Sequence, residues 1–298
     1  MKKVSRFFPA ASTWSPAPLL CTFTPMENPR IGFIGGGNMA RALLGGLTAS
    51  GVDAGRLWVS DPDEVARVQL ARDLGVHATA DNQAVVEACD VVVLAVKPQV
   101  LGEVARGLDL SSRPQVLVLS IAAGVRTEAL SRWLGGHGRL VRAMPNTPAL
   151  VGSGVAGLYA RPGVDEAGRE TAERILRAVG TAVWVEHEDL LDAVTAVSGS
   201  GPAYFFLVME AMEAAAGELG LDAATARLLT VETAFGAAKL ALEAHEPAAV
   251  LRQRVTSPGG TTAAALAVLE AGGLRDLFAR ALAAARDRAR ALAAELEG

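Results

Sequence analysis

The pattern of apolar and polar positions changes near residue 187 of this 298-residue chain. Before that point, short apolar runs alternate with amphipathic stretches, an order typical of βαβ units and a mostly parallel sheet. We also expect some antiparallel pairing at an edge of that sheet. Apolar runs predict strands at residues 31–34, 57–60, 90–96, 115–121, 139–143, 154–160 and 181–185.

Helices are predicted on both sides of residue 187. In the first part, helices at 39–50 and 64–74 each end at a glycine, Gly51 and Gly75. Several later helices are apolar nearly all round and must be buried on most sides. One domain of this size has too little interior for that, so we expect a homodimer of interleaved helices. The later helices are predicted at residues 190–197, 202–219, 223–243, 247–255, 262–271 and 273–295.

A glycine-rich segment follows the first predicted strand and opens the first helix. Gly35 permits a tight turn, Gly37 lets the backbone approach a pyrophosphate, and Ala40 keeps the helix close to the sheet. The free N–H groups of the helix N-terminus then face the phosphates. We therefore expect a dinucleotide to bind at Gly35, Gly36, Gly37, Asn38, Met39 and Ala40.

Asp61 ends the second strand, where an acid binds the adenosine ribose of NAD. Asp63 and Glu64 follow it, so a 2′-phosphate would meet negative charge, and either NADPH or NADH is expected with a mild preference for NADH. The alternative is that Asp61-Pro62-Asp63 only caps the next helix. Both interpretations remain open at this point.

Three further segments follow predicted strands, where ligands of open α/β sheets bind. Lys97 within residues 95–98 lies near the cofactor or is a solvated surface lysine. Small residues at 120–124 leave room for a flat nicotinamide ring, or serve packing. Asn146, between two prolines, faces the cleft or forms a turn with its own backbone.

These patterns indicate an α/β chain with an N-terminal Rossmann-like dinucleotide-binding domain at 29–187. An all-α dimerisation and substrate domain follows at 188–298. Residues 1–28 are expected to be a dispensable disordered tail, and the alternative is that translation begins at Met26. A signal peptide is not expected, because Pro9, Pro16 and Pro18 interrupt every apolar stretch there.

Composition excludes several classes of partner. The net charge is −4 with no basic run, so we expect no nucleic-acid partner. Cys21, Cys89 and the four histidines show no metal-ligand spacing, so we expect no metal and a reducing cytoplasm. No apolar run is long enough to span a bilayer, so no membrane is expected.

The segment Thr256–Thr262 ends at another predicted helix start. Consecutive backbone N–H groups there can hold an anion, and Thr261 and Thr262 add hydroxyls, which suits a carboxylate plus one more polar group. A simple Ser or Thr helix cap is the alternative.

Six segments occur together in one order, and the chain thereby resembles the Δ1-pyrroline-5-carboxylate reductase family of proline synthesis. The resemblance covers residue 30 to the C-terminus. It implies an NAD(P)H-binding N-terminal domain and a helical domain that forms dimers, which often assemble further into rings. The segments are 35–40, 95–98, 122–124, 144–148, 198–204 and 256–262.

The resemblance also implies roles for single residues. Gly260, Thr261 and Thr262 hold the substrate carboxylate, Thr262 also bonds the ring nitrogen as the catalytic residue, and Glu188 lies near the substrate. The implied cofactor contacts are the 35–40 loop together with Asp61, Asp63, Asn82, Ala95, Val96, Lys97, Pro98, Ile121, Ala122 and Ala123. Arg254 departs from the family pattern, because some members have an amide side chain there.

The implied reaction is hydride transfer from NAD(P)H to the C=N carbon, giving L-proline. The absence of a placed His or Lys in the motifs of the helical half suits an imine better than a ketone or hydroxy acid, whose conversion usually needs a dedicated His, Lys or Tyr. Two other interpretations are a nucleotide-binding sensor, whose substrate loop would be damaged, and a reductase of a larger cyclic imine, which the sequence barely discriminates.

Overall fold

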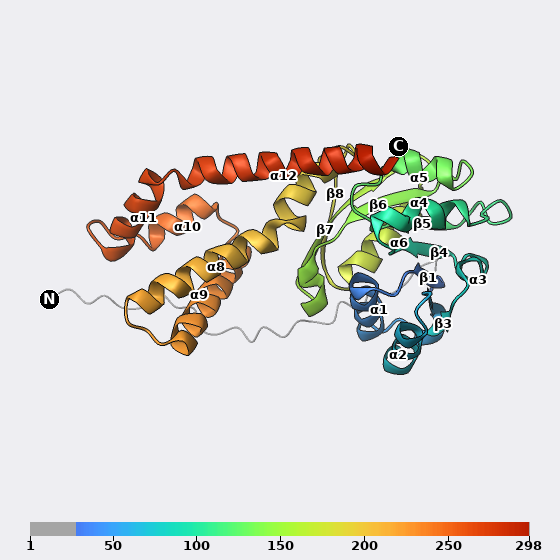
Figure 1. Ribbon diagram of the computed structural model, residues 1–298, viewed down its shortest axis with the longest axis horizontal. Coiled ribbons are helices and arrows are strands. Elements are labelled where there is room, and N and C mark those ends of the chain that lie inside the picture. The colour runs from blue at the N-terminus through green and yellow to red at the C-terminus, as the bar shows by residue number, and fades with distance from the viewer. Residues whose placement is uncertain (1–27, 298) are drawn as a thin grey trace.

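The computed structural model describes residues 28–297, in which a sheet-containing domain is followed by an extended group of helices (Figure 1). The prediction about a dispensable N-terminal tail falls, apart from Asn28, outside the described residues.

The sheet has eight strands in the order β3-β2-β1-β4-β5-β6-β7-β8. The half that contains β1 is parallel, with Ile31 of β1 opposite both Leu57 and Val91. All residues of β1, β4 and β5 are buried, because helices cover both faces of the sheet. The strands are β1 (Ile31–Ile34), β2 (Leu57–Ser60), β3 (His77–Thr79), β4 (Val91–Leu94), β5 (Leu117–Ser120), β6 (Leu140–Met144), β7 (Gly154–Ala160) and β8 (Gly180–Trp184).

Two features of the sheet differ from the prediction. The antiparallel pair is β6 with β7, which lies inside the sheet, whereas both edge strands pair in parallel. The reversal occurs because only a short 3₁₀ turn joins β6 to β7, while the helix α6 (Glu166–Arg177) carries the chain across to β8. The short edge strand β3 was not predicted, because His77-Ala78-Thr79 is mostly exposed and has no apolar run.

The helices beside the sheet create two hydrophobic cores, one on each face. Leu43, Leu44 and Ile175 belong to one core and Leu101 and Leu130 to the other. These elements are α1 (Asn38–Ala49), η1 (Ala54–Arg56), α2 (Glu64–Leu74), α3 (Asn82–Ala88), α4 (Pro98–Arg106), α5 (Thr127–Trp133), η2 (Thr147–Val151) and α6.

The helical part begins with a helix that continues through a π-helical turn. The chain runs through α7 (Leu190–Val194), η3 (Thr195–Gly199) and α8 (Gly201–Glu218), with Pro202 in the first turn of α8 as predicted. It continues in α9 (Ala223–Ala244), α10 (Ala248–Arg254), α11 (Thr261–Ala271) and α12 (Leu274–Glu297). The helix α12 returns along the molecule, so that its C-terminal end lies beside the sheet domain (Figure 1).

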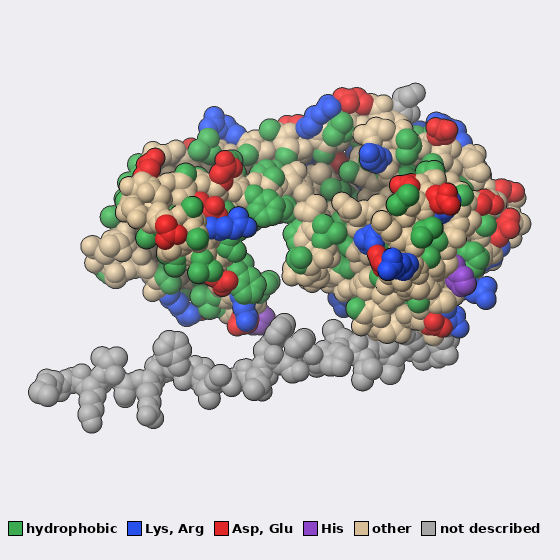
Figure 2. All heavy atoms as spheres, turned by 60° about the horizontal axis from the view of Figure 1, so that its bottom comes forward, with side chains coloured by type: hydrophobic (Ala, Val, Ile, Leu, Met, Phe, Trp, Pro, Cys, Tyr) green, Lys and Arg blue, Asp and Glu red, His purple; other side chains and the backbone are tan. Residues whose placement is uncertain are grey.

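The helical part exposes large apolar side chains. Phe205 of α8, Phe235 of α9 and Val268 of α11 have 66%, 64% and 73% of their surface exposed. Figure 2 shows hydrophobic side chains spread over the helical lobe and around the open space between that lobe and the sheet domain. A single copy of the chain therefore leaves uncovered the apolar surface that the sequence predicted to be buried in a dimer.

Candidate functional site

The turn between β1 and α1 has the geometry that a dinucleotide loop requires. Gly35 has φ +99°, in the region that glycine favours, and a Cβ there would lie 2.8 Å from the Ala95 carbonyl oxygen. The Gly35 N–H donates to the Ser60 carbonyl at 2.8 Å, which fixes the loop to the end of β2. No other residue type can occupy this position without a shift of the backbone.

The N-terminus of α1 is open toward the carboxyl edge of the sheet. Gly37 is the cap residue and supplies no side-chain hydrogen bond, and a Cβ there would meet no heavy atom within 4 Å. Gly37 and Asn38 are exposed, whereas Met39 packs on the core and Ala40 is buried. Free N–H groups beside open space fit the pyrophosphate of a dinucleotide.

Asp61 and Asp63 have different hydrogen-bond partners, and only Asp63 caps the next helix. Asp63 caps α2, because its Oδ1 accepts from the Val65 N–H at 2.9 Å. Asp61 instead joins the loop after β2 to the glycine loop after β1. Its Oδ2 accepts from the Gly36 N–H at 2.7 Å, and its Oδ1 accepts from the Asp63 N–H at 2.9 Å. The Asp61 carboxylate thus lies directly at the glycine loop.

Two more predicted residues extend the site along the carboxyl edge of the sheet. Asn82 begins α3, and its Oδ1 accepts from the buried Ser60 hydroxyl at 2.7 Å. Lys97 is exposed and precedes α4 without capping it. Asn82 is therefore fixed, whereas the Lys97 side chain extends into solvent.

The segments 95–98 and 121–123 lie side by side. They follow β4 and β5, which pair with Leu94 opposite Ser120, and the Ile121 N–H donates to the Leu94 carbonyl at 3.1 Å. Ala122 is buried, while Ile121 and Ala123 remain partly exposed. The structure thus brings the predicted cofactor segments to one edge of the sheet, as the connection rules for open sheets require.

Asn146 has neither of the roles considered from the sequence. Its Oδ1 accepts from the Val155 N–H at 2.8 Å and its Nδ2 donates to the Ser198 carbonyl at 3.1 Å. Asn146 thereby ties β7 to the π-helical turn η3. The sequence could not show this, because the partners lie nine and 52 residues away.

Glu188 lies between β8 and α7, and several donors surround its carboxylate. Its partners are Thr127, at the start of α5, and Arg142, which is nearly fully buried in β6. Sequence reasoning missed both partners. Arg142 had one available signal, a lone charge inside an otherwise apolar predicted strand.

A second group of charges lies beside Glu188. Arg126 pairs with Asp189 at 2.6 Å, and the buried Asp192 lies 3.8 Å from Arg126 and 3.6 Å from Arg290 of α12. Burial lowers the pKa of the Arg126 guanidinium, but the hydrogen bond to Asp189 and the nearby carboxylates raise it more, so the net shift is upward. Arg126 stays a cation that joins the sheet domain to the start of the helical part.

The predicted substrate loop lies elsewhere in the chain. Gly260 is the cap residue of α11 and no side chain caps that helix, so the Ser or Thr cap considered from the sequence does not form. Thr261 is exposed and Thr262 is partly buried. In Figure 1, α11 lies at the end of the helical part farthest from α1 and β1, so one chain does not bring the predicted substrate loop to the predicted cofactor segments.

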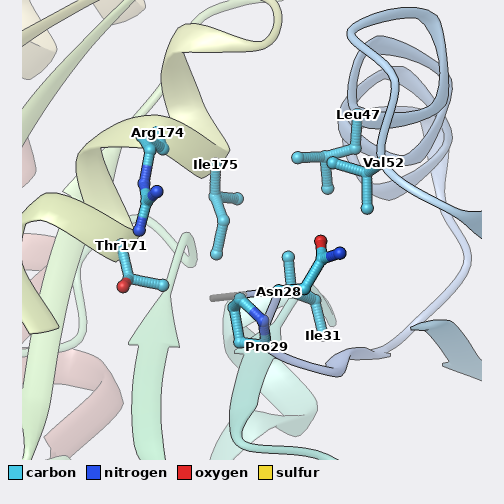
Figure 3. A pocket seen from close by; sticks show the side chains of 8 residues that line it. All are labelled: Asn28, Pro29, Ile31, Leu47, Val52, Thr171, Arg174 and Ile175. Atoms are coloured by element: carbon cyan, nitrogen blue, oxygen red, sulfur yellow. The ribbon is translucent and has the colours of Figure 1, made fainter. Parts of the chain in front are cut away.

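A small pocket lies on the other side of the sheet domain, away from these residues. It is lined by the start of β1 together with Leu47 of α1, Val52 in the loop after α1, and residues of α6 that include Ile175 (Figure 3). The dinucleotide loop lies at the opposite, carboxyl end of β1, so this pocket is not part of the candidate site. Within residues 28–297, no group of three or more His, Cys, Asp or Glu side chains is arranged to hold a metal ion.

The fold and the site define an NAD(P)-dependent oxidoreductase with a Rossmann-like domain and an all-α dimerisation domain. Residues 30–124 match the family model described as NADP oxidoreductase coenzyme F420-dependent. Residues 188–292 match the model described as pyrroline-5-carboxylate reductase dimerisation.

Known proteins resemble the chain over nearly its whole length. A pyrroline-5-carboxylate reductase of Pseudomonas aeruginosa is 48% identical over 91% of this chain and 99% of the relative. The solved pyrroline-5-carboxylate reductase of Coxiella burnetii has a TM-score of 0.85 at 48% identity, over 89% of this chain and 98% of that one. The Plasmodium falciparum enzyme, solved with NADP bound, has a TM-score of 0.79 at 28% identity, over 90% of this chain and 99% of that one. The chain belongs to the pyrroline-5-carboxylate reductase family.

The prediction that no apolar run is long enough to span a bilayer is wrong, because the helix Leu190–Glu218 is long and apolar enough to do so by length and composition alone. The helix is this long because the π-helical turn η3 continues α7 into α8, where the sequence suggested a break at Ser198–Gly201. The matched dimerisation region contains the whole helix, and this region gives its apolar surface a different explanation.

Proposed function

We propose that this chain reduces Δ1-pyrroline-5-carboxylate to L-proline, the last step of proline biosynthesis. One observation carries the proposal. The chain is a member of this family, and it has both an open dinucleotide loop at the start of α1 and a 256–262 loop that leaves the start of α11 without a side-chain cap. The test is to mix purified protein with pyrroline-5-carboxylate and NADH or NADPH. We expect nucleotide oxidation and L-proline. Oxidation of neither nucleotide would overturn the reaction.

The residues at the carboxyl edge of the sheet fit a nicotinamide dinucleotide. Bound there, the reduced cofactor supplies the hydride. Gly35–Ala40 hold the pyrophosphate at the N-terminus of α1, and Asp61, Asp63 and Asn82 lie toward the adenosine ribose. The segments 95–98 and 121–123 line the remainder of the cofactor.

Thr262 orients the substrate nitrogen, while the backbone N–H groups of 260–262 hold the carboxylate at the N-terminus of α11. This assignment is supported by the absence of a side-chain cap at Gly260. Thr262→Ala should lower kcat/KM about 10- to 100-fold, the usual scale for losing one positioned hydrogen bond. Thr262→Ser keeps the hydroxyl and should retain most activity. Unchanged kinetics in Thr262→Ala would remove this residue from the mechanism.

The substrate is an imine, which can enter the site already protonated. A protonated C=N group accepts a hydride better than a neutral one, so the site needs a hydrogen-bond partner more than a strong acid. The 256–262 loop contains hydroxyls and amides but no His or Lys. That composition supports an imine over a hydroxy acid.

The site is shared between two copies of the chain. The proposal rests on the distance between the loop at α11 and the dinucleotide edge in one chain, and on the exposed apolar surface between them (Figure 1, Figure 2). The cofactor edge of one subunit then meets the 256–262 loop of a second copy. We extend the assembly to a ring of dimers, which light scattering of the purified protein tests.

NADH is the preferred cofactor in this proposal. Support comes from the acidic surroundings of the ribose position, where Asp61, Asp63 and Glu64 follow one another and would repel a 2′-phosphate. Asp61→Ser should shift the preference toward NADPH in a steady-state comparison of the two cofactors. A much lower KM of the wild-type protein for NADPH would contradict the preference.

The domain boundary is placed between residues 187 and 188. The last strand ends at Trp184 and α7 begins at Leu190, which supports this division. The cytoplasm is the proposed location, based on the scarcity of cysteine. Fractionation of cells that express the full chain tests the location.

A further inference from the structure

The Glu188 carboxylate accepts three hydrogen bonds from Thr127 and Arg142 within one chain. Its Oε1 accepts from the Thr127 N–H at 2.7 Å and from Arg142 Nη1 at 3.1 Å, and its Oε2 accepts from the Thr127 hydroxyl at 2.7 Å. The side chains of Glu188 and Arg142 are 15% and 3% exposed. Both carboxylate oxygens therefore have protein donors, and one of these donors is a buried cation.

Neighbouring contacts hold the same point of the chain. Asp189 pairs with Arg126 at 2.6 Å, and Arg161 Nη1 donates to the Thr127 carbonyl at 3.2 Å. The backbone of Thr127 is therefore held by Glu188 in the segment after β8, which Arg142 of β6 also contacts, and by the residue after β7. These elements converge on the start of α5.

The segment that Thr127 anchors is the nicotinamide side of the cofactor site. Only residues 121–126 separate β5 from α5, and Ala122 and Val125 within them are buried. Gly124 has φ +79°, and a Cβ there would lie 3.2 Å from Leu296 of α12. The loop is short and is held at both ends, so the position of Thr127 determines the position of Ile121–Ala123.

We propose that Glu188 is a positioning residue that holds the nicotinamide-side loop 121–124 in place through Thr127, and is not a substrate ligand. The inference rests on the proposed reductase function for the identity of the bound cofactor. It changes the role that the family resemblance gave to Glu188.

The charge of Arg142 explains why Glu188 is unsuited to bind substrate directly. Turning the Glu188 side chain toward a substrate would break its contacts with Thr127 and leave Arg142 a buried cation without its partner. A fixed loop, in contrast, needs the closed set of hydrogen bonds that the structure shows.

The experiment compares Glu188→Gln, Thr127→Val and the double variant. Thr127→Val keeps the side-chain shape and removes only the hydroxyl that donates to Glu188. Two quantities are measured: the dissociation constant of NADH, by fluorescence titration without substrate, and the kcat and KM for pyrroline-5-carboxylate. Glu128→Gln is the matched control, because Glu128 is on α5 but 81% exposed.

We expect both single variants to weaken NADH binding several-fold and to lower kcat about 10- to 100-fold, on the scale of a small misplacement of reacting groups. KM for the imine should stay within about twofold, and the double variant should be no worse than Glu188→Gln because the residues act through one contact. Thr127→Ser should restore wild-type behaviour, and Glu128→Gln should match wild type.

The positioning role would be overturned if Glu188→Gln raised the KM for the imine without changing NADH affinity, while Thr127→Val left NADH affinity, kcat and KM at wild-type values. Lowered thermal stability with unchanged NADH affinity and kcat would overturn it as well. The NADH titration requires no turnover, so a failure of the proposed reaction would be seen separately, as a wild-type protein that binds NADH and reduces no imine.

Discussion

The sheet domain and the helical part bury their apolar side chains in different places. Around the sheet, Phe33, Leu43 and Leu119 have no exposed surface, so this domain completes its cores within one chain. Along α8, α9 and α11, large side chains such as Phe235 stay exposed. Each would contribute roughly 1.5–3 kcal/mol on full burial. The comparison teaches that the sheet domain is complete within one copy, whereas the helical part exposes apolar surface that a second copy would cover.

The largest effect is expected from a charge introduced on the exposed apolar surface of the helical part. Phe235→Asp should convert the dimer to monomers and reduce activity about 100-fold or more, because a carboxylate cannot be buried in an apolar interface without a partner. Light scattering and the reductase assay measure the two effects. NADH binding should persist, since the sheet domain is complete within each chain.

The matched control for Phe235→Asp is Val65→Asp. Val65 lies on α2 of the sheet domain and has the same 64% exposure as Phe235. It should leave both oligomeric state and activity near wild type. A dimeric, active Phe235→Asp protein would mean that α9 faces solvent and that a different surface joins the subunits.

The proposed shared site can be tested by combining two impaired subunits. Thr262→Ala impairs the substrate loop, and Gly37→Asp places a carboxylate in the open space where the pyrophosphate binds. Gly37→Asp should fold, because Gly37 has φ −66° and Asp is a favourable cap residue. Each variant alone should therefore lose activity for a different reason.

Coexpression in equal amounts should restore about one quarter of wild-type activity, because half of the dimers are mixed and each mixed dimer has one intact shared site. Measurement of kcat on the purified mixture, against the two variants mixed after separate purification, provides the comparison. No recovery in the coexpressed sample would show that each chain uses its own 256–262 loop.

Much of the sheet domain could be predicted because its signals are local. The strand 154–160 was predicted from its apolar run. The helix 64–74 was predicted from its helical spacing and from the glycine that ends it, and Gly75 has the left-handed φ of 71° that favours glycine at a helix end. The strand β3 could not be predicted, since only its pairing with β2 defines it. That the predicted cofactor segments after β1, β2, β4 and β5 lie at one edge of the sheet was predictable, because parallel strands end at one edge.

The contacts that complete the site are tertiary and gave no local signal. Asn146 bonds across to Val155 and Ser198, and Glu188 bonds to residues 46 and 61 positions away. The π-helical turn at Thr195–Gly199 also escaped prediction, because Ser198-Gly199-Ser200 is typical of a break in a helix. These residues could be found by sequence, but their partners could not.

A pH measurement tests whether the sheet domain is stable independently of the helical part. His137 is buried, and burial lowers the pKa of its imidazole although the hydrogen bond to the Val116 carbonyl opposes the shift. The folded protein therefore binds fewer protons than the unfolded chain as the pH falls past the ordinary value of 6.5, and stability falls with it.

His137→Gln, which can still donate to Val116, should lose less stability than wild type between pH 7.5 and 5.5, by a few degrees in Tm. Thermal unfolding at both pH values measures the difference. The same difference should appear in the Phe235→Asp background, because His137 lies wholly in the sheet domain. Equal losses in wild type and His137→Gln would mean that other groups determine the acid sensitivity.

The smallest effect concerns the thiol of Cys89, which reports on opening of the sheet domain. Burial, together with the charge of Asp90, raises its pKa to about 12, so almost no thiolate forms at neutral pH. In a Cys21→Ser protein, a thiol reagent should label Cys89 only on the timescale of unfolding, and at the same slow rate with or without Phe235→Asp. Rapid labelling of the Phe235→Asp protein would show that the sheet domain needs the dimer after all, and the contrast between the two regions would then be one of degree.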